Sequence, residues 1–275
     1  MSVVAEDRAT GGTGGAGGPL LSLRGISKHF GAVRALNHVD LDVPAGQVTA
    51  LVGDNGAGKS TLIKTVSGIW PPTGGEIRWD GNRVDIGTPK VADHLGIATM
   101  YQDLALCDNL DIVQNMFLGH EVLSHRLLDE TQMEITAKQT LADLSVTTVQ
   151  SVRQLVGSLS GGQRQSVAVA RAVMRDARLV IMDEPTAALG VSQTAQVLDL
   201  IKTLGARGIA VIVISHNLND VFEVADRLAV LYLGRLVSSG PLAEYDRQRA
   251  VELITTGRSA GDPPAADPGA TGAEG

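Results

Sequence analysis

The sequence predicts an α/β fold with a mainly parallel β-sheet, and three observations support it. Continuous apolar runs at residues 179–182 and 211–214 alternate with helical segments, as expected for strands that are covered on both faces. A strand-like run at 48–52 leads through a glycine-rich loop into a helix, which is typical of a parallel sheet. Short segments of alternating apolar and polar residues within 20–50 and 75–86 predict a second, small antiparallel sheet.

The composition of the 275-residue chain narrows the classes of protein to consider. A formal net charge of −7 argues against a nucleic acid as the main partner. Cys107 is the only cysteine, which excludes an internal disulfide and suits a reducing compartment. No run approaches the roughly 18 apolar residues of a transmembrane helix, and the acidic N-terminus does not resemble a secretory signal. We therefore expect an intracellular protein that reaches a membrane only through other subunits.

One folded unit is expected between two disordered tails. Residues 1–19 are rich in glycine, and residues 257–275 consist mostly of small and polar residues without a hydrophobic period. The folded unit should therefore cover residues 20–256. Within it, residues about 103–163 carry apolar positions at helical spacing and are expected to form an inserted helical subdomain.

The most specific motif is the glycine-rich loop that follows the first predicted parallel strand. It reads Gly53, Asp54, Asn55, Gly56, Ala57, Gly58, Lys59 and Ser60, with Thr61 next, and it matches G-x-x-x-x-G-K-[ST]. Glycines allow several backbone N–H groups to point into one concavity, and the following helix N-terminus adds positive potential. We predict that this loop binds a nucleoside triphosphate, with Lys59 at the β- and γ-phosphates and Ser60 at Mg²⁺.

Two acidic residues follow the apolar strand at 179–182. Asp183 is predicted to hold Mg²⁺, because it stands at the carboxyl end of a parallel strand, where ligands bind in open α/β sheets. Glu184 would then lie beside the γ-phosphate and polarise an attacking water. Without the glycine-rich loop upstream, a solvated acidic turn would be the better interpretation.

A second segment is also suited to bind an anion. Ser160 can cap the helix that follows it, and the segment Ser160, Gly161, Gly162 and Gln163 places backbone N–H groups at the positive end of that helix. A chain folded around one phosphate loop has little use for a second such site, whereas two copies placed head to tail would use both. An ordinary capped helix is the alternative interpretation.

Two further polar residues follow strand-like runs. His216 comes after 211–215 and could hydrogen-bond a γ-phosphate, although a lone histidine is more often structural. Gln102 comes after 97–101, and its amide could contact Mg²⁺ or water. Neither residue would indicate a nucleotide site without the glycine-rich loop.

Taken in order, these motifs resemble the ATP-binding subunit of ATP-binding cassette (ABC) transporters. The matching segments are Walker A at 53–60, the Q-loop glutamine Gln102, the signature LSGGQ at 159–163, Walker B at 179–185 with Glu184, the switch histidine His216 and the adenine-stacking aromatic Phe30. The resemblance covers nearly the whole folded unit. It implies a P-loop NTPase (RecA-like) core with ATP and Mg²⁺ as ligands and ATP hydrolysis as the reaction.

The resemblance also implies partners. Two copies of the chain would form a homodimer, closing head to tail around two ATP molecules, and pass their motion to transmembrane permease subunits through the segment after Gln102. A solute-binding protein would be an indirect partner, and no nucleic acid is expected. The chain would lie on the cytoplasmic face of the inner (plasma) membrane as a peripheral subunit.

One position departs from the family pattern. Gly190 stands where the family usually has an aspartate that crosses the dimer interface, so that role is not transferred. Segments 101–119, 186–191 and 215–237 resemble the ATPases of monosaccharide importers of the ribose, xylose and fructose class, whose single-cassette members share the glycine. The transported sugar is not encoded in these segments.

Three alternatives stay open from the sequence. The chain could serve an importer of branched-chain amino acids or of another small solute. It could be a soluble ABC-type ATPase that acts on DNA or ribosomes, although the stretch 61–158 is too short for the coiled coils of the DNA-repair members. Gly190 also suggests a regulatory cassette that does not hydrolyse ATP.

Overall fold

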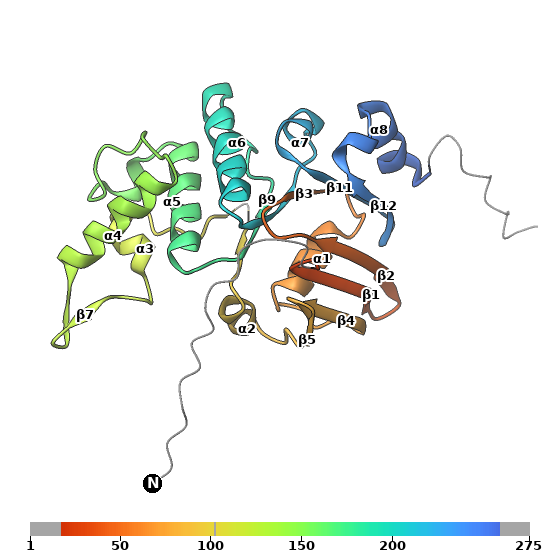
Figure 1. Ribbon diagram of the computed structural model, residues 1–275, viewed down its shortest axis with the longest axis horizontal. Coiled ribbons are helices and arrows are strands. Elements are labelled where there is room, and N and C mark those ends of the chain that lie inside the picture. Colours follow the sequence, from red (N-terminus) through yellow and green to blue (C-terminus); the bar gives the residue numbers. More distant parts are fainter. Residues whose placement is uncertain (1–17, 102, 259–275) are drawn as a thin grey trace, which may run out of the picture.

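The structure is a computed structural model that describes residues 18–101 and 103–258. Gln102 and most of the two tails predicted to be disordered lie outside the described residues. Figure 1 shows three parts: a parallel sheet flanked by helices, an antiparallel sheet below it, and a group of helices at one end. Among the described residues, no helix has the length and apolar character needed to cross a bilayer.

The central sheet has six strands in the order β12-β11-β3-β10-β9-β6. Its strands are β3 (Val48–Val52), β6 (Ile97–Met100), β9 (Leu179–Asp183), β10 (Ala210–Ile214), β11 (Arg227–Tyr232) and β12 (Arg235–Pro241). All neighbours are parallel except β11 and β12, which form an antiparallel hairpin. The predicted mainly parallel sheet is confirmed.

The apolar runs in this sheet are continuous because both of its faces are buried. Along β9, Val180 and Met182 pack into one hydrophobic core, while Leu179 and Ile181 pack into another. Successive side chains of a strand point to opposite faces, so a strand between two cores needs apolar residues at every position. The helices over one face are α5 (Gly161–Met174) and α6 (Val191–Ala206), and α1 (Lys59–Val66) packs against the other.

The second sheet is antiparallel, as predicted. Its order is β2-β1-β4-β5, with β1 (Leu21–Phe30), β2 (Val33–Val43), β4 (Gly74–Trp79) and β5 (Asn82–Val84). The buried residues of β1 and β2 share the core of α1, so this sheet covers the helix that follows the glycine-rich loop. The fold therefore places the start of β2 beside that loop.

The helical part contains α3 (Ile112–Phe117), α4 (Glu130–Asp143) and the N-terminal half of α5. It also contains a two-stranded hairpin, β7 (Leu123–Ser124) and β8 (Leu127–Leu128), which the mostly helical prediction did not include. Its two turn residues, His125 and Arg126, have φ values of 51° and 69°. Such a turn matches the twist of a hairpin and cannot continue a helix. The remaining helices are α2 (Pro89–His94), α7 (Leu218–Val224) and α8 (Arg247–Thr256).

Candidate nucleotide-binding site

The glycine-rich loop joins the end of β3 to the start of α1, as the sequence predicted. Its last glycine, Gly58, has a φ of 106°, and a Cβ there would come within 2.7 Å of the carbonyl oxygen of Ala35 on β2. Only glycine tolerates both this conformation and this approach. The loop is therefore pressed against β2. Within the loop, the N–H of Asn55 donates to Oδ1 of Asp54 and the N–H of Ala57 donates to the carbonyl oxygen of Asp54, so a concave anion site would use the other backbone N–H groups.

Lys59 folds back over the loop. Its Nζ donates to the carbonyl oxygens of Gly53 at 2.7 Å and Asp54 at 3.0 Å. Burial lowers the pKa of Lys59 below its usual value, and the nearby carboxylates of Glu184 and Asp183 oppose that shift. An ammonium that is partly removed from water binds an incoming anion strongly, because the anion replaces lost hydration.

Asp183 and Glu184 stand at the carboxyl end of β9 and line a cavity together with the loop. Burial raises the pKa of Asp183, and the adjacent Glu184 raises it further, whereas Lys59 lowers it. Glu184 has a φ of 53°, which is unusual for a residue with a side chain. Its backbone N–H donates to the carbonyl of Ile214 on the neighbouring strand β10, at 2.9 Å.

His216 follows β10 and contacts the same carboxylate. The distance from its Nδ1 to Oε2 of Glu184 is 2.8 Å, while 78% of the histidine side chain remains exposed. β9 and β10 are parallel neighbours with Asp183 opposite Ile214, so both polar segments leave the sheet at the same edge. The fold thus brings Asp183, Glu184 and His216 together beside Lys59.

Among the described residues, Lys59, Asp183 and Glu184 line a cavity of about 580 Å³, and His216 lies outside its lining. The lining includes residues 55–61, the pair Asp183 and Glu184, and also Val33, Arg34 and Leu233. Its walls combine a cationic loop, two carboxylates and exposed apolar side chains. Such a cavity can take an elongated ligand with an anionic end and an apolar end.

The oxygen ligands that the cavity offers suit Mg²⁺ better than a metal ion that is coordinated by protein side chains alone. The candidate ligands are the hydroxyl of Ser60 and the carboxylate of Asp183, both oxygen donors. Among the described residues, no group of three or more His, Cys, Asp or Glu side chains could hold an ion. Mg²⁺ is usually bound through one or two protein oxygens and completes its shell with phosphate and water.

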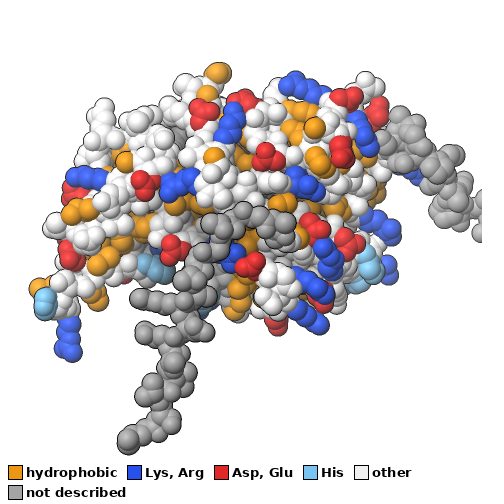
Figure 2. Space-filling view, viewed as in Figure 1, with side chains coloured by type: hydrophobic (Ala, Val, Ile, Leu, Met, Phe, Trp, Pro, Cys, Tyr) orange, Lys and Arg blue, Asp and Glu red, His pale blue; other side chains and the backbone are white. Residues whose placement is uncertain are grey.

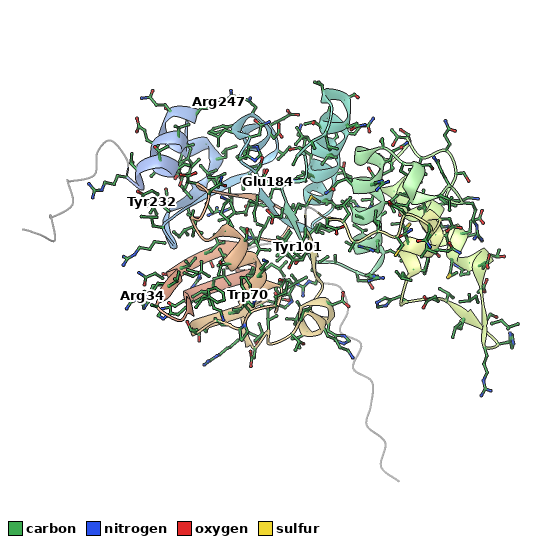
Figure 3. All side chains as sticks on the ribbon, turned by 180° about the vertical axis from the view of Figure 1, so that it is seen from behind. Arg34, Trp70, Tyr101, Glu184, Tyr232 and Arg247 are labelled. Atoms are coloured by element: carbon green, nitrogen blue, oxygen red, sulfur yellow. The ribbon has the colours of Figure 1, made fainter. Side chains whose placement is uncertain are left out.

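Phe30 lies near this cavity but, among the described residues, it is not part of the lining. Its cross-strand partner Val33 is part of the lining. The Phe30 side chain is 41% exposed, and its ring packs against Trp70 with the ring centroids 4.8 Å apart. In Figure 3, Trp70 lies on the side of the antiparallel sheet, whereas Glu184 lies at the parallel sheet.

The Ser160–Gln163 segment lies outside the cavity. Ser160 caps α5: its Oγ accepts from the backbone N–H of Gln163, and Oε1 of Gln163 accepts from the backbone N–H of Ser160. A Cβ at Gly161 would come within 2.6 Å of Cδ2 of Leu189, and one at Gly162 within 3.2 Å of Cβ of Gln193. The paired glycines therefore also leave room for α5 to pack close to Leu189 and to the start of α6.

Gly190 occupies the position before α6. It is the N-cap residue of that helix, with a φ of −74° and no side-chain cap, and a Cβ there would meet nothing within 4 Å. The next residue, Val191, is 91% exposed. The backbone therefore permits an aspartate at this position, and neither strain nor crowding explains the glycine.

Sequence reasoning missed several residues around the site, among them Arg34, Trp70 and Leu233. Arg34 and Leu233 line the cavity, and Leu233 is 72% exposed with a φ of 43°. A leucine in the left-handed region is rare, so no turn pattern in the sequence pointed to it. Trp70 could have been noticed as one of only two tryptophans, but its contact with Phe30 depends on the fold.

Known proteins with a similar sequence identify the family of the chain. The family model described as ABC transporter matches residues 36–187. The fructose import ATP-binding protein FrcA of Rhizobium meliloti is 45% identical and covers 86% of this chain and 94% of its own length. The xylose/arabinose import ATP-binding protein XylG of Sulfolobus acidocaldarius is 43% identical with the same coverage.

Solved structures give the same result for the fold. The ADP conformation of MJ1267, an ATP-binding cassette of an ABC transporter, matches with a TM-score of 0.72 and 26% identity, over 86% of this chain and 95% of that one. The chain therefore belongs to the ABC transporter family, and the resemblance inferred from its motifs is confirmed. Members of this family are ATP-binding subunits that hydrolyse ATP. The predictions of ATP as the nucleotide and of ATP hydrolysis as the reaction are therefore confirmed.

Proposed function

We propose, from this membership, that the chain is the ATP-hydrolysing subunit of a monosaccharide importer. The observation that carries the proposal is the match to two full-length relatives, FrcA and XylG, whose names assign fructose and xylose/arabinose import. Each match spans 94% of the relative, so the likeness extends over the whole subunit. The sugar is selected elsewhere, because a nucleotide-binding subunit does not contact it.

We assign the phosphate groups of ATP to the glycine-rich loop. Backbone N–H groups of residues 53–61 would hold the phosphate oxygens, and Lys59 would exchange its carbonyl partners for the β- and γ-phosphates. Ser60, Asp183 and Gln102 would hold Mg²⁺, which supplies neutralisation of charge on the phosphates when bound. The raised pKa of Asp183 supports this role, since a cation would relieve the cost of its charge.

Glu184 is the proposed general base. It lies beside Asp183 at the edge of the cavity, where it can orient a water for attack on the γ-phosphate. His216 holds the Glu184 carboxylate in the structure described here, at 2.8 Å. We propose that His216 also contacts the γ-phosphate when nucleotide binds, so that one histidine links the base to its substrate.

The second half of each ATP site would come from another copy of the chain. Ser160–Gln163 forms a capped helix N-terminus that lies outside the cavity, so it cannot close over the loop of the same chain. Two chains placed head to tail would put this segment of each against the loop of the other. Gly190 would lie at that interface and, because it has no side chain, would contact the other chain through its backbone alone.

Permease subunits would hold this homodimer at the cytoplasmic face of the inner membrane. The described residues contain no helix that could span a bilayer, so membrane attachment would depend on those subunits. On the face that Figure 2 shows, basic and acidic side chains are interspersed rather than gathered by sign. A protein partner of mixed charge suits such a surface better than a polyanion does.

Co-purification from membranes tests the proposal. The tagged chain should recover a permease and a solute-binding protein, and the assembled complex should hydrolyse ATP faster when fructose, xylose, arabinose or ribose is added. Stimulation by branched-chain amino acids and by none of these sugars would replace the sugar assignment with the amino-acid alternative. Recovery of ribosomal or DNA-bound partners without a permease would overturn the transport role.

A further inference from the structure

The ring of Phe30, at the end of strand β1, is held by two neighbours, Trp70 and Lys28. Trp70 packs against it at 4.8 Å between centroids with the planes at 75°, an edge-to-face arrangement that aromatic rings favour. Nζ of Lys28 lies 5.2 Å from the centre of the Phe30 ring and donates to the carbonyl of Pro71 at 2.7 Å. With 41% of Phe30 still exposed, the ring is fixed yet open to a ligand.

Trp70 is in turn tied to helix α1. Its backbone N–H donates to the carbonyl oxygen of Lys64 in α1, at 3.1 Å, and Nζ of Lys64 lies 4.7 Å from the centre of the indole ring. The same helix begins at Lys59, in the phosphate loop. Trp70 therefore connects the end of strand β1, which carries Phe30, to the helix that carries the phosphate-binding groups.

We propose that Trp70 is a positioning residue for the nucleotide base, which sets the place of the Phe30 ring relative to the phosphate loop. The inference rests on the proposed contact between Phe30 and the base. A bound nucleotide must contact the Phe30 ring with its base and the phosphate loop with its phosphates at the same time. These two contacts come from different elements, so a fixed connection between them lowers the ordering cost of binding.

Two ligands separate this role from a general effect on the fold. ATP would use both the ring and the loop, whereas inorganic tripolyphosphate would use the loop alone. Calorimetry with each ligand and Mg²⁺ should show that Trp70→Ala weakens ATP binding about fivefold, the size expected for one lost aromatic pair, without changing tripolyphosphate binding. Trp70→Phe keeps an aromatic ring beside Phe30 and should restore most of the ATP affinity.

Phe30→Ala is the reference variant. If it leaves the ratio of ATP to tripolyphosphate affinity unchanged, the base contact is wrong, and the role of Trp70 falls with it. If Phe30→Ala lowers the ratio and Trp70→Ala does not, only the role of Trp70 is overturned. An equal loss of both ligands in Trp70→Ala, not restored by Trp70→Phe, would show a purely structural role.

Fluorescence gives an independent measurement. The chain has two tryptophans, and Trp79 is buried in the core with 5% exposure. In a Trp79→Phe variant the emission comes from Trp70 alone. ATP should change that emission and tripolyphosphate should not, because only the base reaches the Phe30 ring. The same change with both ligands would contradict the inference.

Discussion

Glu184 is held in a backbone conformation that side chains rarely adopt. Its φ of 53° places it in the left-handed region, at a cost on the order of 1–3 kcal/mol, and the surrounding structure must supply that energy. Two contacts hold the residue in this place: its N–H donates to the carbonyl of Ile214, and its carboxylate lies 2.8 Å from Nδ1 of His216. Glu184 also lines the cavity, so this rare conformation lies at the candidate site, where strained residues tend to cluster.

Glu184→Gln should bind ATP with nearly unchanged affinity and lose turnover by at least about 100-fold, since an amide cannot accept the proton of water. Phosphate release by the purified variant, with nucleotide binding measured in parallel, checks both parts. Turnover at the wild-type rate would remove Glu184 from the role of base.

The raised pKa of Asp183 predicts that the stability of the protein depends on pH. Burial and the adjacent Glu184 raise the pKa of Asp183 in the folded state above its value in the unfolded state. Ionised Asp183 therefore destabilises the folded protein, and this loss of unfolding free energy is complete once the pH has risen through the folded-state pKa. Asp183→Asn should therefore melt at a higher temperature than the wild type at pH 7. The difference should shrink below the usual aspartate pKa of about 3.9, where the residue is protonated in both states.

Asp54→Asn is the control for that prediction, because Asp54 is an exposed carboxylate on the same loop. It should leave the melting temperature unchanged at both pH values. A melting temperature for Asp183→Asn below that of the wild type at pH 7 would contradict the argument.

At the scale of the elements, Asn115 fastens the segment after Gln102 to helix α3. The side chain is fully buried; its Oδ1 accepts from the N–H of Cys107, and its Nδ2 donates to the carbonyls of Cys107, Leu110 and Asp111. One side chain thus satisfies the polar backbone of an irregular stretch. This stretch is the one proposed to pass motion to the permease.

Asn115→Ala should cost about 2 kcal/mol of unfolding free energy, because it leaves several buried backbone groups without partners. Denaturant unfolding measures this loss. Gln132→Ala on α4 is the matched control: among the described residues its exposed side-chain amide bonds only Thr136, so a change within about 0.5 kcal/mol is expected. If Asn115→Ala lost no more unfolding free energy than the control, the segment would not depend on the Asn115 side chain for its structure.

At the scale of the whole molecule, each ATP site is proposed to need two chains. Lys59→Ala removes the loop lysine but keeps the Ser160–Gln163 segment, whereas Ser160→Arg keeps the loop and disrupts that segment. Homodimers of either variant have no complete site. A mixed dimer has one, so equal amounts of the two variants should recover about a quarter of wild-type turnover if dimers assort at random.

The two variants measured separately are the controls for that mixture. Turnover equal to the sum of their separate activities would mean that each chain completes its own site. Melting curves of both variants would show whether they are folded, since loss of the Ser160 cap alone costs about 1 kcal/mol.

Local patterns in the sequence were sufficient to predict the fold class and most of the site. Residues 53–60 encode a loop shape through glycine positions, and the run 179–183 encodes a strand buried on both faces. Each of these depends on neighbours along the chain, so no knowledge of the rest of the fold is needed. Gly190 could likewise be recognised as a departure from a motif, although not explained.

The pairings between distant residues depended on the tertiary structure. Glu184 meets His216 because β9 and β10 are adjacent and in register, which no local pattern specifies. Phe30 meets Trp70 because the antiparallel sheet folds over α1. Gly161, which the sequence predicts to be part of an anion site, also lies against Leu189, because α5 packs beside α6. Sequence motifs identify the chemical groups of the site. Strand order, register and helix packing decide which of those groups can act together, because this arrangement depends on burial summed over the whole chain.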